Sequence, residues 1–406
     1  MRAATAFLAL LLMTANVAAQ STLERVVIVE RHGVRPPTKA AADLAKYAQS
    51  PWPQWPVAPG ELTAHGAAAM ALMGEAIRHT YENRGLMAAG ACPTGVFVWS
   101  DSGDQRTRAS GDALLKGFGC ARPSQHLNDG IRDPLFSGSD AKLCRPADAK
   151  QMTEERLRET LAANRAAYET ARRRLQAVLT PDGCGKSGQP VCTVGDGENS
   201  VITGKNGELR LEGPLSVAAT MAENLLLEYS EGMPLNDVGW GNGAAALSEV
   251  MVLHRLYADV TRRNLVYAAP RGSRLAQQIV DLLNGRSSAI PDAAPVPGDA
   301  KLVVFLGHDT NLSNLSGFLG TPWTLPGQPD ATAPGAALAF ELWRAADGSK
   351  SVRIKVLYQI PDDTRLLRAG MHEQPVALSG CPDGICTLAE LTKRMETSVA
   401  PACLAQ

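Results

Sequence analysis

The sequence predicts an α/β protein: a central mixed, mostly parallel sheet flanked by helices, with a mainly helical inserted domain. Short apolar, β-branched runs that suit buried strands occur early and late in the chain, whereas residues 135–265 have mainly helical patterns. Three of these runs end in polar loops rich in Arg, His and Asp, and such loops are where α/β sheets bind ligands. The composition, 45% hydrophobic and 20% charged over 406 residues, supplies enough apolar material for a core.

The N-terminal part contains two predicted strands. The apolar run 23–29 predicts a buried strand that stops at charged residues, and the run 96–99 predicts a second strand. Between them, the Pro-rich stretch 51–56 predicts a surface excursion, and residues 63–78 predict a helix. After the second strand and a polar loop, a helical pattern starts near Arg106.

The middle of the chain predicts helices, and the C-terminal part predicts strands again. Residues 154–179 predict one long amphipathic helix, and further helices are expected over 215–229 and 247–266. The fully apolar run 302–306 predicts a core strand, followed by a helix over 312–319. Two later strands, expected to be antiparallel, are predicted over the following ranges: 340–343 and 352–358.

These patterns predict how the chain divides. Residues 1–19 have a positive start, a short apolar run and the small-residue pattern 17–19, which together predict a cleaved signal peptide rather than a buried helix. We expect an α/β catalytic domain from 20–134 plus 266–406, and a helical insertion (cap) domain from 135–265. No later stretch approaches 18 apolar residues, so a periplasmic or secreted protein without a membrane anchor is expected.

Charge and cysteine usage narrow the function classes. The 40 Lys and Arg residues balance 41 Asp and Glu, and no basic stripe for nucleic acid is visible, so an anionic substrate must meet a local cluster of cations. An even number of cysteines behind a signal peptide predicts disulfides, with no C-x2-C pair for zinc. Eight cysteines allow 105 pairings, so the spacing alone leaves the connectivity open, although two short loops favour local pairs. The cysteines are Cys92, Cys120, Cys144, Cys184, Cys192, Cys381, Cys386 and Cys403.

The first motif places a histidine between two arginines directly after a predicted buried strand. Flanking cations disfavour a protonated imidazole, so His32 can stay a neutral nucleophile between Arg31 and Arg35. The same guanidinium groups can bind two oxygens of a phosphate, and Gly33 allows a close backbone approach. The alternative is a basic, solvated turn with a structural histidine.

Two further motifs follow the other predicted strands. His308 and Asp309 end the strongest strand, where the acid can protonate a leaving oxygen and the imidazole can bind a phosphate oxygen. Asp309 could instead only cap the following helix. Arg106 adds a cation suited to the charge that develops on a phosphoryl transition state, unless it is a helix-surface arginine.

Together these residues resemble the histidine acid phosphatases, the branch of the histidine phosphatase superfamily marked by R-H-G-x-R-x-P and H-D. The two motifs stand here at 31–37 and 308–309, and the resemblance extends over nearly the whole mature chain. Within the family, the chain looks similar to the bacterial periplasmic phytases and glucose-1-phosphatases. The other matching stretches are 52–55, 239–241, 323–330 and 401–403.

The resemblance implies a role for each matching residue. His32 would be the nucleophile and Asp309 the proton donor. The phosphate clamp would consist of Arg31, Arg35, Arg106 and His308. The cysteine positions also match the phytase pattern, which implies the pairs Cys92–Cys120, Cys144–Cys403, Cys184–Cys192 and Cys381–Cys386.

The expected substrate pocket carries mixed signals. Thr38 and Lys39 resemble the Thr-Lys pair that lines the pocket of the phytases. Glucose-1-phosphatases carry a bulky apolar residue at the Thr38 position, so this resemblance favours a phytase. The stretches 213–215 and 229–234 look closer to glucose-1-phosphatases. Glu212 adds a negative charge near the expected rim, which disfavours a polyphosphorylated substrate.

The expected function is that of a secreted acid phosphatase that hydrolyses phosphomonoesters through a phosphohistidine, with phytate as the substrate. Arginines would supply the positive charge, and no metal-binding cluster such as H-x-H is present, so we expect neither a metal nor another cofactor. The partner would be a small phosphorylated substrate, and the chain is expected to be a monomer. An acidic pH optimum follows from the need for a protonated aspartate.

The residues are also compatible with other functions. The enzyme could be a glucose-1-phosphatase or an acid phosphatase of broad specificity for sugar phosphates and nucleotides. A periplasmic binding protein that captures phosphorylated ligands would explain the arginines, but not a nucleophile and a separate proton donor. A phosphotransferase or mutase would resemble relatives that use a glutamate donor in the cytosol, which the signal peptide and the H-D pair disfavour.

Overall fold

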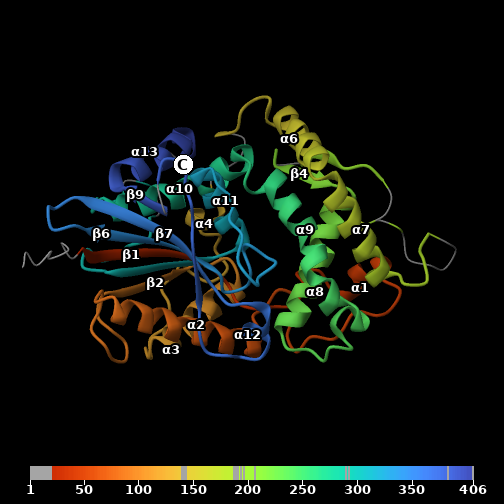
Figure 1. Cartoon of the computed structure of the whole chain (residues 1–406), viewed down its shortest axis with the longest axis horizontal. Helices are drawn as coiled ribbons and strands as arrows, with labels where there is room; N and C mark the ends of the chain where they lie inside the picture. Colours follow the sequence, from red (N-terminus) through yellow and green to blue (C-terminus); the bar gives the residue numbers. More distant parts are fainter. Residues whose placement is uncertain are drawn as a thin grey trace, which may run out of the picture.

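The computed structural model of the chain describes residues 21–138, 144–185, 192, 194, 197–204, 207–288, 290, 293–381 and 384–404. The predicted signal peptide, residues 1–19, lies outside these described residues. Within them, no helix is long and apolar enough to cross a lipid bilayer. Figure 1 shows a sheet with helices on both faces on one side of the molecule, and a group of helices on the other side.

A mixed sheet of seven strands forms the centre of the first part. Strand β1 (Thr22–Arg31) pairs in parallel with β5 (Leu302–Gly307), which pairs in parallel with β2 (Val96–Ser100). On its other edge, β1 pairs antiparallel with β6 (Ala337–Arg344). Every residue of β2 and β5 is buried, because helices cover both faces, and this explains why both strands are continuous apolar runs.

The outer strands of the sheet are antiparallel. β7 (Lys350–Tyr358) pairs with β6, β8 (His372–Pro375) and β9 (Ile385–Thr387). The prediction of an α/β fold with a mixed sheet is confirmed, but mostly parallel pairing is not, since four of the six pairings are antiparallel. The connection 345–349 between β6 and β7 allows a hairpin but is too short for the crossover that a parallel neighbour needs.

Helices cover both faces of the sheet (Figure 1). On one face lie α2 (Ala64–Asn83) and α3 (Gln105–Gly117), and on the other lie α10 (Leu265–Leu283), α11 (Asp309–Leu319) and α13 (Leu388–Ser398). Alternate side chains of β1 point to the two faces, so each face has its own apolar core. The short helical segments are α1 (Ala41–Leu44), η1 (Ala45–Tyr47), α4 (Pro134–Ser137), η2 (Val238–Gly241), α12 (Pro361–Arg365) and η4 (Pro401–Cys403).

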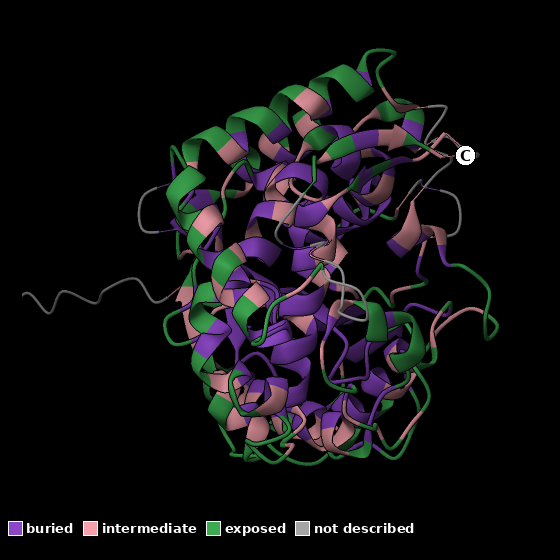
Figure 2. Cartoon of the chain, turned by 90° about the vertical axis from the view of Figure 1, so that its right-hand side faces the viewer, coloured by how far each residue is buried: buried purple, intermediate pink, exposed green. Residues whose placement is uncertain are grey.

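The second part of the molecule is mainly helical and has its own core. Its elements are α6 (Ala149–Ala163), α7 (Arg165–Leu179), β3 (Ser200–Thr203), β4 (Leu209–Glu212), α8 (Pro214–Ser230) and α9 (Gly243–Thr261). Figure 2 shows these helices with exposed outer faces and buried inner faces. We keep the domain boundaries 135–265 as a proposal, because Leu44 and Trp52 from the N-terminal region also pack into this core.

Two helices predicted as continuous are interrupted. The predicted helix 154–179 starts earlier and breaks at Asn164, whose side-chain amide donates to the carbonyl four residues before it (2.9 Å). The predicted helix 247–266 is also divided: α9 ends at Thr261, and Asn264 caps the separate helix α10. Asparagine side chains compete for local backbone groups, and the apolar periodicity does not report this competition.

Four disulfides join the eight cysteines. Their pairing is the one that the family resemblance implies. The bond between Cys144 and Cys403 connects the start of the helical part with the end of the chain, which are 259 positions apart. The other pairs are Cys92–Cys120, Cys184–Cys192 and Cys381–Cys386.

The start of α2 supports the loop that follows β1. The backbone amide of Thr63, the N-cap residue, donates to the carbonyl of Val34 (3.2 Å), and its hydroxyl accepts from the amide of Gly66 (2.8 Å). A Cβ atom at Gly66 would lie 2.3 Å from the Val34 carbonyl oxygen. The loop that carries the R-H-G motif can therefore pack on this helix only because residue 66 has no side chain.

This contact predicts the effect of a single methyl group. Gly66→Ala should lower the free energy of unfolding by about 1–3 kcal/mol, because the methyl must displace backbone. Alanine is otherwise the better helix former by about 1 kcal/mol, so the sign of the change in the free energy of unfolding separates the two effects. Urea denaturation measures it, with Gly298→Ala as the control, since no described atom beyond its chain neighbours lies within 4 Å of that position. A Gly66→Ala protein as stable as wild type would contradict the close contact.

Candidate active site

The loops after three neighbouring strands meet at one edge of the sheet. Arg31 at the end of β1 lies in register with Gly307 at the end of β5. The amide of His32 donates to the carbonyl of Gly307 (2.9 Å), and the amide of Asp101, just after β2, donates to the carbonyl of Leu306 (2.9 Å). Backbone hydrogen bonds thus bring the three predicted motifs together.

His32 is buried at this edge with one ring nitrogen engaged. Its Nδ1 lies 2.8 Å from the carbonyl oxygen of Gly33. A carbonyl can only accept a hydrogen bond, so Nδ1 carries the proton in this contact and the Nε2 lone pair is available. Burial first, and then the charges of Arg35, Arg31 and Arg106, hold the pKa of His32 well below its usual value. The neutral nucleophile expected from the sequence is therefore favoured.

Acidic side chains hold the two arginines that flank His32. Arg31 is fully buried; it contacts Glu223 of α8, lies 3.2 Å from Asp330 and donates to the carbonyl of Thr332 (2.6 Å). Arg35 lies 3.5 Å from the same Glu223 oxygen. One glutamate from the helical part thus contacts both arginines and keeps their charges beside His32.

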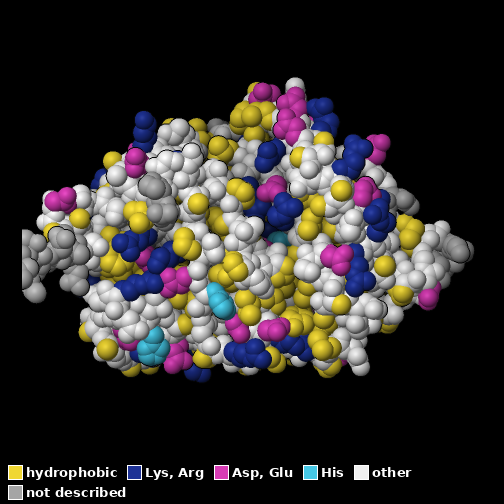
Figure 3. All heavy atoms as spheres, viewed as in Figure 1, with side chains coloured by type: hydrophobic (Ala, Val, Ile, Leu, Met, Phe, Trp, Pro, Cys, Tyr) yellow, Lys and Arg dark blue, Asp and Glu magenta, His cyan; other side chains and the backbone are white. Residues whose placement is uncertain are grey.

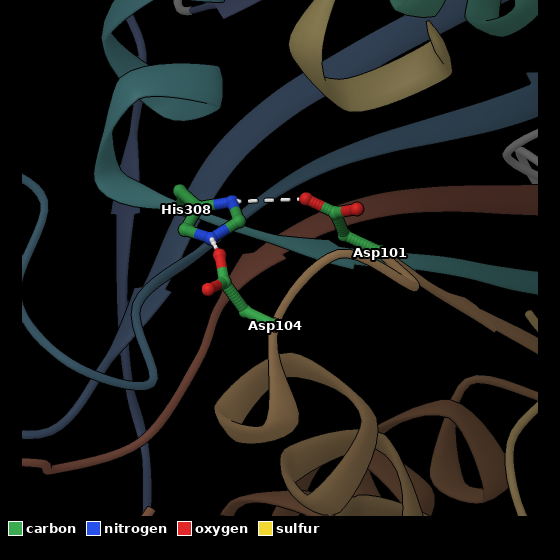
Figure 4. Close-up of side chains that lie close together, drawn as sticks. All are labelled: Asp101, Asp104 and His308. Carbon is green, nitrogen blue, oxygen red and sulfur yellow. Dashed lines mark hydrogen bonds and ion pairs between the residues drawn. The ribbon is translucent and has the colours of Figure 1, made fainter. Parts of the chain in front are cut away.

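The residues Asp101, Asp104 and His308 form a second group, shown in Figure 4. His308 Nε2 lies 3.0 Å from Asp104 Oδ2, and Nδ1 lies 3.5 Å from Asp101 Oδ2. Asp104 also contacts Arg106 (2.8 Å), and the hydrogen bond from His308 leads the causes that lower the pKa of Asp104 to about 2. Two of the predicted clamp residues are thus oriented by one carboxylate. A bound phosphate would compete with a carboxylate for His308.

Asp309 is the first residue of α11 and faces α9. Its Oδ1 accepts from the amide of Thr310 (2.8 Å), so it takes part in the helix start as well. Its Oδ2 accepts a hydrogen bond from Arg262 and lies 3.8 Å from Nε2 of His254. The Nδ1 atom of His254 lies 3.5 Å from Asp330. The predicted proton donor therefore belongs to a network of charged groups that reaches into the helical part.

The charges around Asp309 decide its protonation in the ligand-free protein. Burial raises the pKa of Asp309, but Arg262, Arg31, His254 and Arg35 outweigh burial and hold the pKa well below its usual value. The carboxylate form is favoured here, whereas a proton donor must be protonated. The negative charge of a bound substrate would act against this balance.

Four residues of this arrangement were missed by the sequence analysis: Glu223, His254, Arg262 and Asp330. Glu223 and His254 are polar residues within apolar stretches of their helices, and this was the signal available for them. Arg262 follows a helix, where no local pattern distinguishes it, whereas Asp330 ends the family-matching stretch 323–330, which was the signal available for it. Their partners lie far away along the chain.

The predicted pocket residues lie outside the buried centre. Thr38 is exposed beside Gly60, whose carbonyl accepts from Arg106 (3.3 Å), so it lies next to the clamp. Lys39 is exposed and lines a cavity of about 150 Å³ together with proline and tryptophan side chains. Glu212 is exposed at the end of β4; among the described residues it has no hydrogen bond or ion pair with the clamp.

Within the part of the chain that the structure describes, two groups of side chains have the geometry to hold a cation. They are Asp101 with Asp104 and His308, and Glu223 with His254 and Asp309. In both groups an arginine already contacts a carboxylate: Arg106 in the first group, Arg262 in the second. The guanidinium groups thus occupy part of the coordinating capacity that a metal ion would use.

The assembled side chains are suited to bind and split a phosphate ester. Figure 3 shows a hollow near the middle of the face viewed, with Lys or Arg side chains beside it and a histidine in its depth. A neutral imidazole, several guanidinium groups and a carboxyl group converge in this region of the chain. Phosphoryl transfer through a covalent intermediate needs groups of these kinds: a nucleophile, charge stabilisation and an acid or base.

Comparisons with known proteins agree with this chemistry. A model of the histidine phosphatase superfamily (branch 2) matches residues 22–359. The chain is 32% identical to the phytase AppA of Escherichia coli (strain K12), over 94% of this chain and 93% of that protein. It is 27% identical to a glucose-1-phosphatase of Salmonella typhimurium, over 95% and 96% of the two chains. The phytase of Hafnia alvei with bound tartrate superimposes with a TM-score of 0.85 at 32% identity, covering 95% of this chain and 99% of that one. The chain therefore belongs to branch 2 of the histidine phosphatase superfamily and is a phosphomonoesterase of the histidine acid phosphatase family.

Proposed function

We propose that the protein is a phytase that hydrolyses phosphomonoesters through a phosphohistidine at His32. The observation that carries this proposal is the orientation of His32: its Nδ1 is engaged by a backbone carbonyl, and its Nε2 is available beside Arg31, Arg35 and Arg106. A binding protein needs the arginines but has no use for a neutral, oriented nucleophile. Acyl or phosphoryl transfer through a covalent intermediate requires one.

In the first step, the Nε2 lone pair of His32 attacks phosphorus and the bond from phosphorus to the leaving oxygen breaks. Asp309 donates its proton to that oxygen, which departs as an alcohol. Arg31, Arg35, Arg106 and His308 bind the other phosphate oxygens, where negative charge must be stabilised. The products of this step are an alcohol, a phosphohistidine and the Asp309 carboxylate.

In the second step, water attacks the phosphohistidine while Asp309, now ionised, accepts a proton from that water. The bond between phosphorus and Nε2 breaks, inorganic phosphate forms, and His32 returns to its neutral form. The charges that lower the pKa of Asp309 suit this role as a base. The cluster around Asp309 therefore has to serve opposite proton transfers in the two steps.

Phytate is the substrate we propose. The phytase of Hafnia alvei has also been solved in complex with myo-inositol hexakis sulphate, with a TM-score of 0.84 to this chain. Sulphate groups are tetrahedral anions, and in this chain Thr38 is exposed next to Arg106, with Lys39, also exposed, as the following residue, so further ring phosphates could meet them. Glucose 1-phosphate is the second candidate, favoured by the similarity to the glucose-1-phosphatase and by the negative charge of Glu212.

We further propose that the mature protein is a monomer in the periplasm or outside the cell. Four disulfides are rare in a reducing cytosol. The predicted signal peptide and the similarity to the E. coli phytase support the same location.

The nucleophile gives the first prediction for this function. His32→Ala should lower turnover of p-nitrophenyl phosphate by about 10⁴-fold or more, the scale of nucleophile removal in other hydrolases. Acid quenching of the wild type with labelled substrate should trap an acid-labile label on His32. His79→Ala, an exposed histidine on α2, should keep full activity. A label on another residue type would overturn the mechanism.

The proton donor gives the second prediction. Asp309→Asn should slow glycerol 2-phosphate, whose alkoxide needs a proton to leave, by about 10²-fold or more. The loss on p-nitrophenyl phosphate should be much smaller, because its phenolate leaves without much help. Steady-state kinetics on both substrates measures the difference, and thermal unfolding checks that the variant is folded. Equal losses would mean that Asp309 serves only the helix start.

Substrate choice gives the third prediction. Lys39→Met should raise the KM for phytate about two- to fivefold, the scale of one exposed ion pair, and leave p-nitrophenyl phosphate nearly unchanged. Glu212→Thr should lower the KM for phytate if its charge reaches the bound polyanion. Lys393→Met on α13, also an exposed lysine, is the control. Wild type that turns over glucose 1-phosphate but not phytate would refute the phytase proposal and leave the phosphatase assignment in place.

A further inference from the structure

Arg262 is held against Asp309 by the geometry at the end of α9. It is the C-cap residue of that helix, where the helix dipole favours a positive charge. Its Nη1 donates to Asp309 Oδ2 and lies 3.4 Å from Nε2 of His254, and its guanidinium lies 5.5 Å from the centre of the Tyr257 ring. Its side chain keeps 18% of its surface exposed, so it also reaches solvent.

This contact opposes the chemistry proposed for Asp309. A carboxylate that accepts a hydrogen bond from a guanidinium is stabilised in its charged form, yet the first step needs the protonated acid. The groups that face Asp309 are Arg262 and His254 from α9, Arg31 at the end of β1 with Arg35 in the loop after it, and Glu223 from α8. Most of these charges are positive in the ligand-free protein.

We propose that Arg262 is a positioning residue: it holds the Asp309 carboxylate in the ligand-free protein and gives it up when a phosphate enters the clamp. This inference rests on the proposed function of Asp309. A bound phosphate dianion pairs with Arg31 and Arg35, and its negative charge lies near Asp309, so a second negative charge there becomes unfavourable. Asp309 then takes up a proton, and the partly exposed Arg262 turns to solvent or to a phosphate oxygen. Arg262 thereby couples substrate binding to protonation of the donor.

The sign of the pH effect follows from the charge of Arg262. Its removal takes away a positive charge that favours the carboxylate, so the pKa of Asp309 in the free protein rises. The acid form then persists to higher pH. The pH dependence of kcat/KM reports groups of the free enzyme, so its alkaline limb should move upwards for substrates that need the proton.

The first experiment compares pH profiles of kcat/KM for glycerol 2-phosphate in the wild type, Arg262→Gln and Arg262→Lys. In Arg262→Gln the alkaline limb should move upwards by roughly one pH unit, the scale for losing one close opposite charge, while Arg262→Lys keeps the wild-type limb. The second ionisation of the substrate is the same for all variants, so a difference between their limbs comes from the protein. Arg255→Gln, on the same helix but 41% exposed and paired with Asp259, is the control and should not shift the limb.

A folded Arg262→Gln protein with an unchanged limb would overturn the proposal. The limb for p-nitrophenyl phosphate should move less than that for glycerol 2-phosphate, because its leaving group needs little protonation. An equal shift on both substrates would place the effect of Arg262 on another group than Asp309. If wild type releases phosphate from neither substrate, the proposed function fails, and that result is distinct from an unchanged limb.

A second experiment uses the wild-type protein and needs no variant of Arg262. Sulfate remains a dianion between pH 4 and 6, so any proton taken up when it binds must come to the protein. Calorimetric titration with sulfate in buffers of different ionisation enthalpy should show uptake of up to one proton per sulfate bound. Asp309→Asn should abolish this uptake while still binding sulfate. Equal uptake in both proteins, or none in the wild type, would refute the coupling.

Discussion

Two guanidinium groups are buried beside His32, and the active site depends on how their charge is balanced. Burying an unpaired charge costs several kcal/mol, so each arginine must meet an acidic partner. For Arg31 and Arg35 that partner is Glu223, which belongs to α8 in the helical part of the molecule. The sheet therefore presents the nucleophile, but the helical part completes the charge balance that allows the arginines to stay there.

The same charges act in opposite directions on the two reacting groups. They disfavour a protonated His32, which keeps the nucleophile neutral, and they favour an ionised Asp309, which is unsuited to donate a proton. A dianionic substrate changes the second effect without removing the first, because it neutralises positive charge close to the carboxyl group. In the mechanism we propose, catalysis at acidic pH then depends on the substrate itself to prepare the donor, with Arg262 setting how firmly Asp309 is held beforehand.

Much of the fold and of the site was predictable, because the decisive patterns are local. The apolar strands and the charged motifs behind them predict the sheet edge where His32 and Asp309 meet, and parallel neighbours bring such ends together. The predictions of helices continuing across Asn164 and Asn264 were wrong, since apolar periodicity continues across residues whose side chains bond the backbone. The prediction of mostly parallel pairing was wrong, and for β6 and β7 the reason is that their short connection allows only a hairpin.

The sequence by itself determined the chemical class of the site: a histidine between two arginines and an H-D pair, each directly after an apolar strand, suffice to predict phosphate chemistry. Only the tertiary structure decided which groups tune that chemistry. Glu223 meets Arg31 across 192 positions of chain, and Arg262 meets Asp309 across 47. Coulombic interaction depends on distance in space and on burial, and neither quantity follows from the order of residues along these segments.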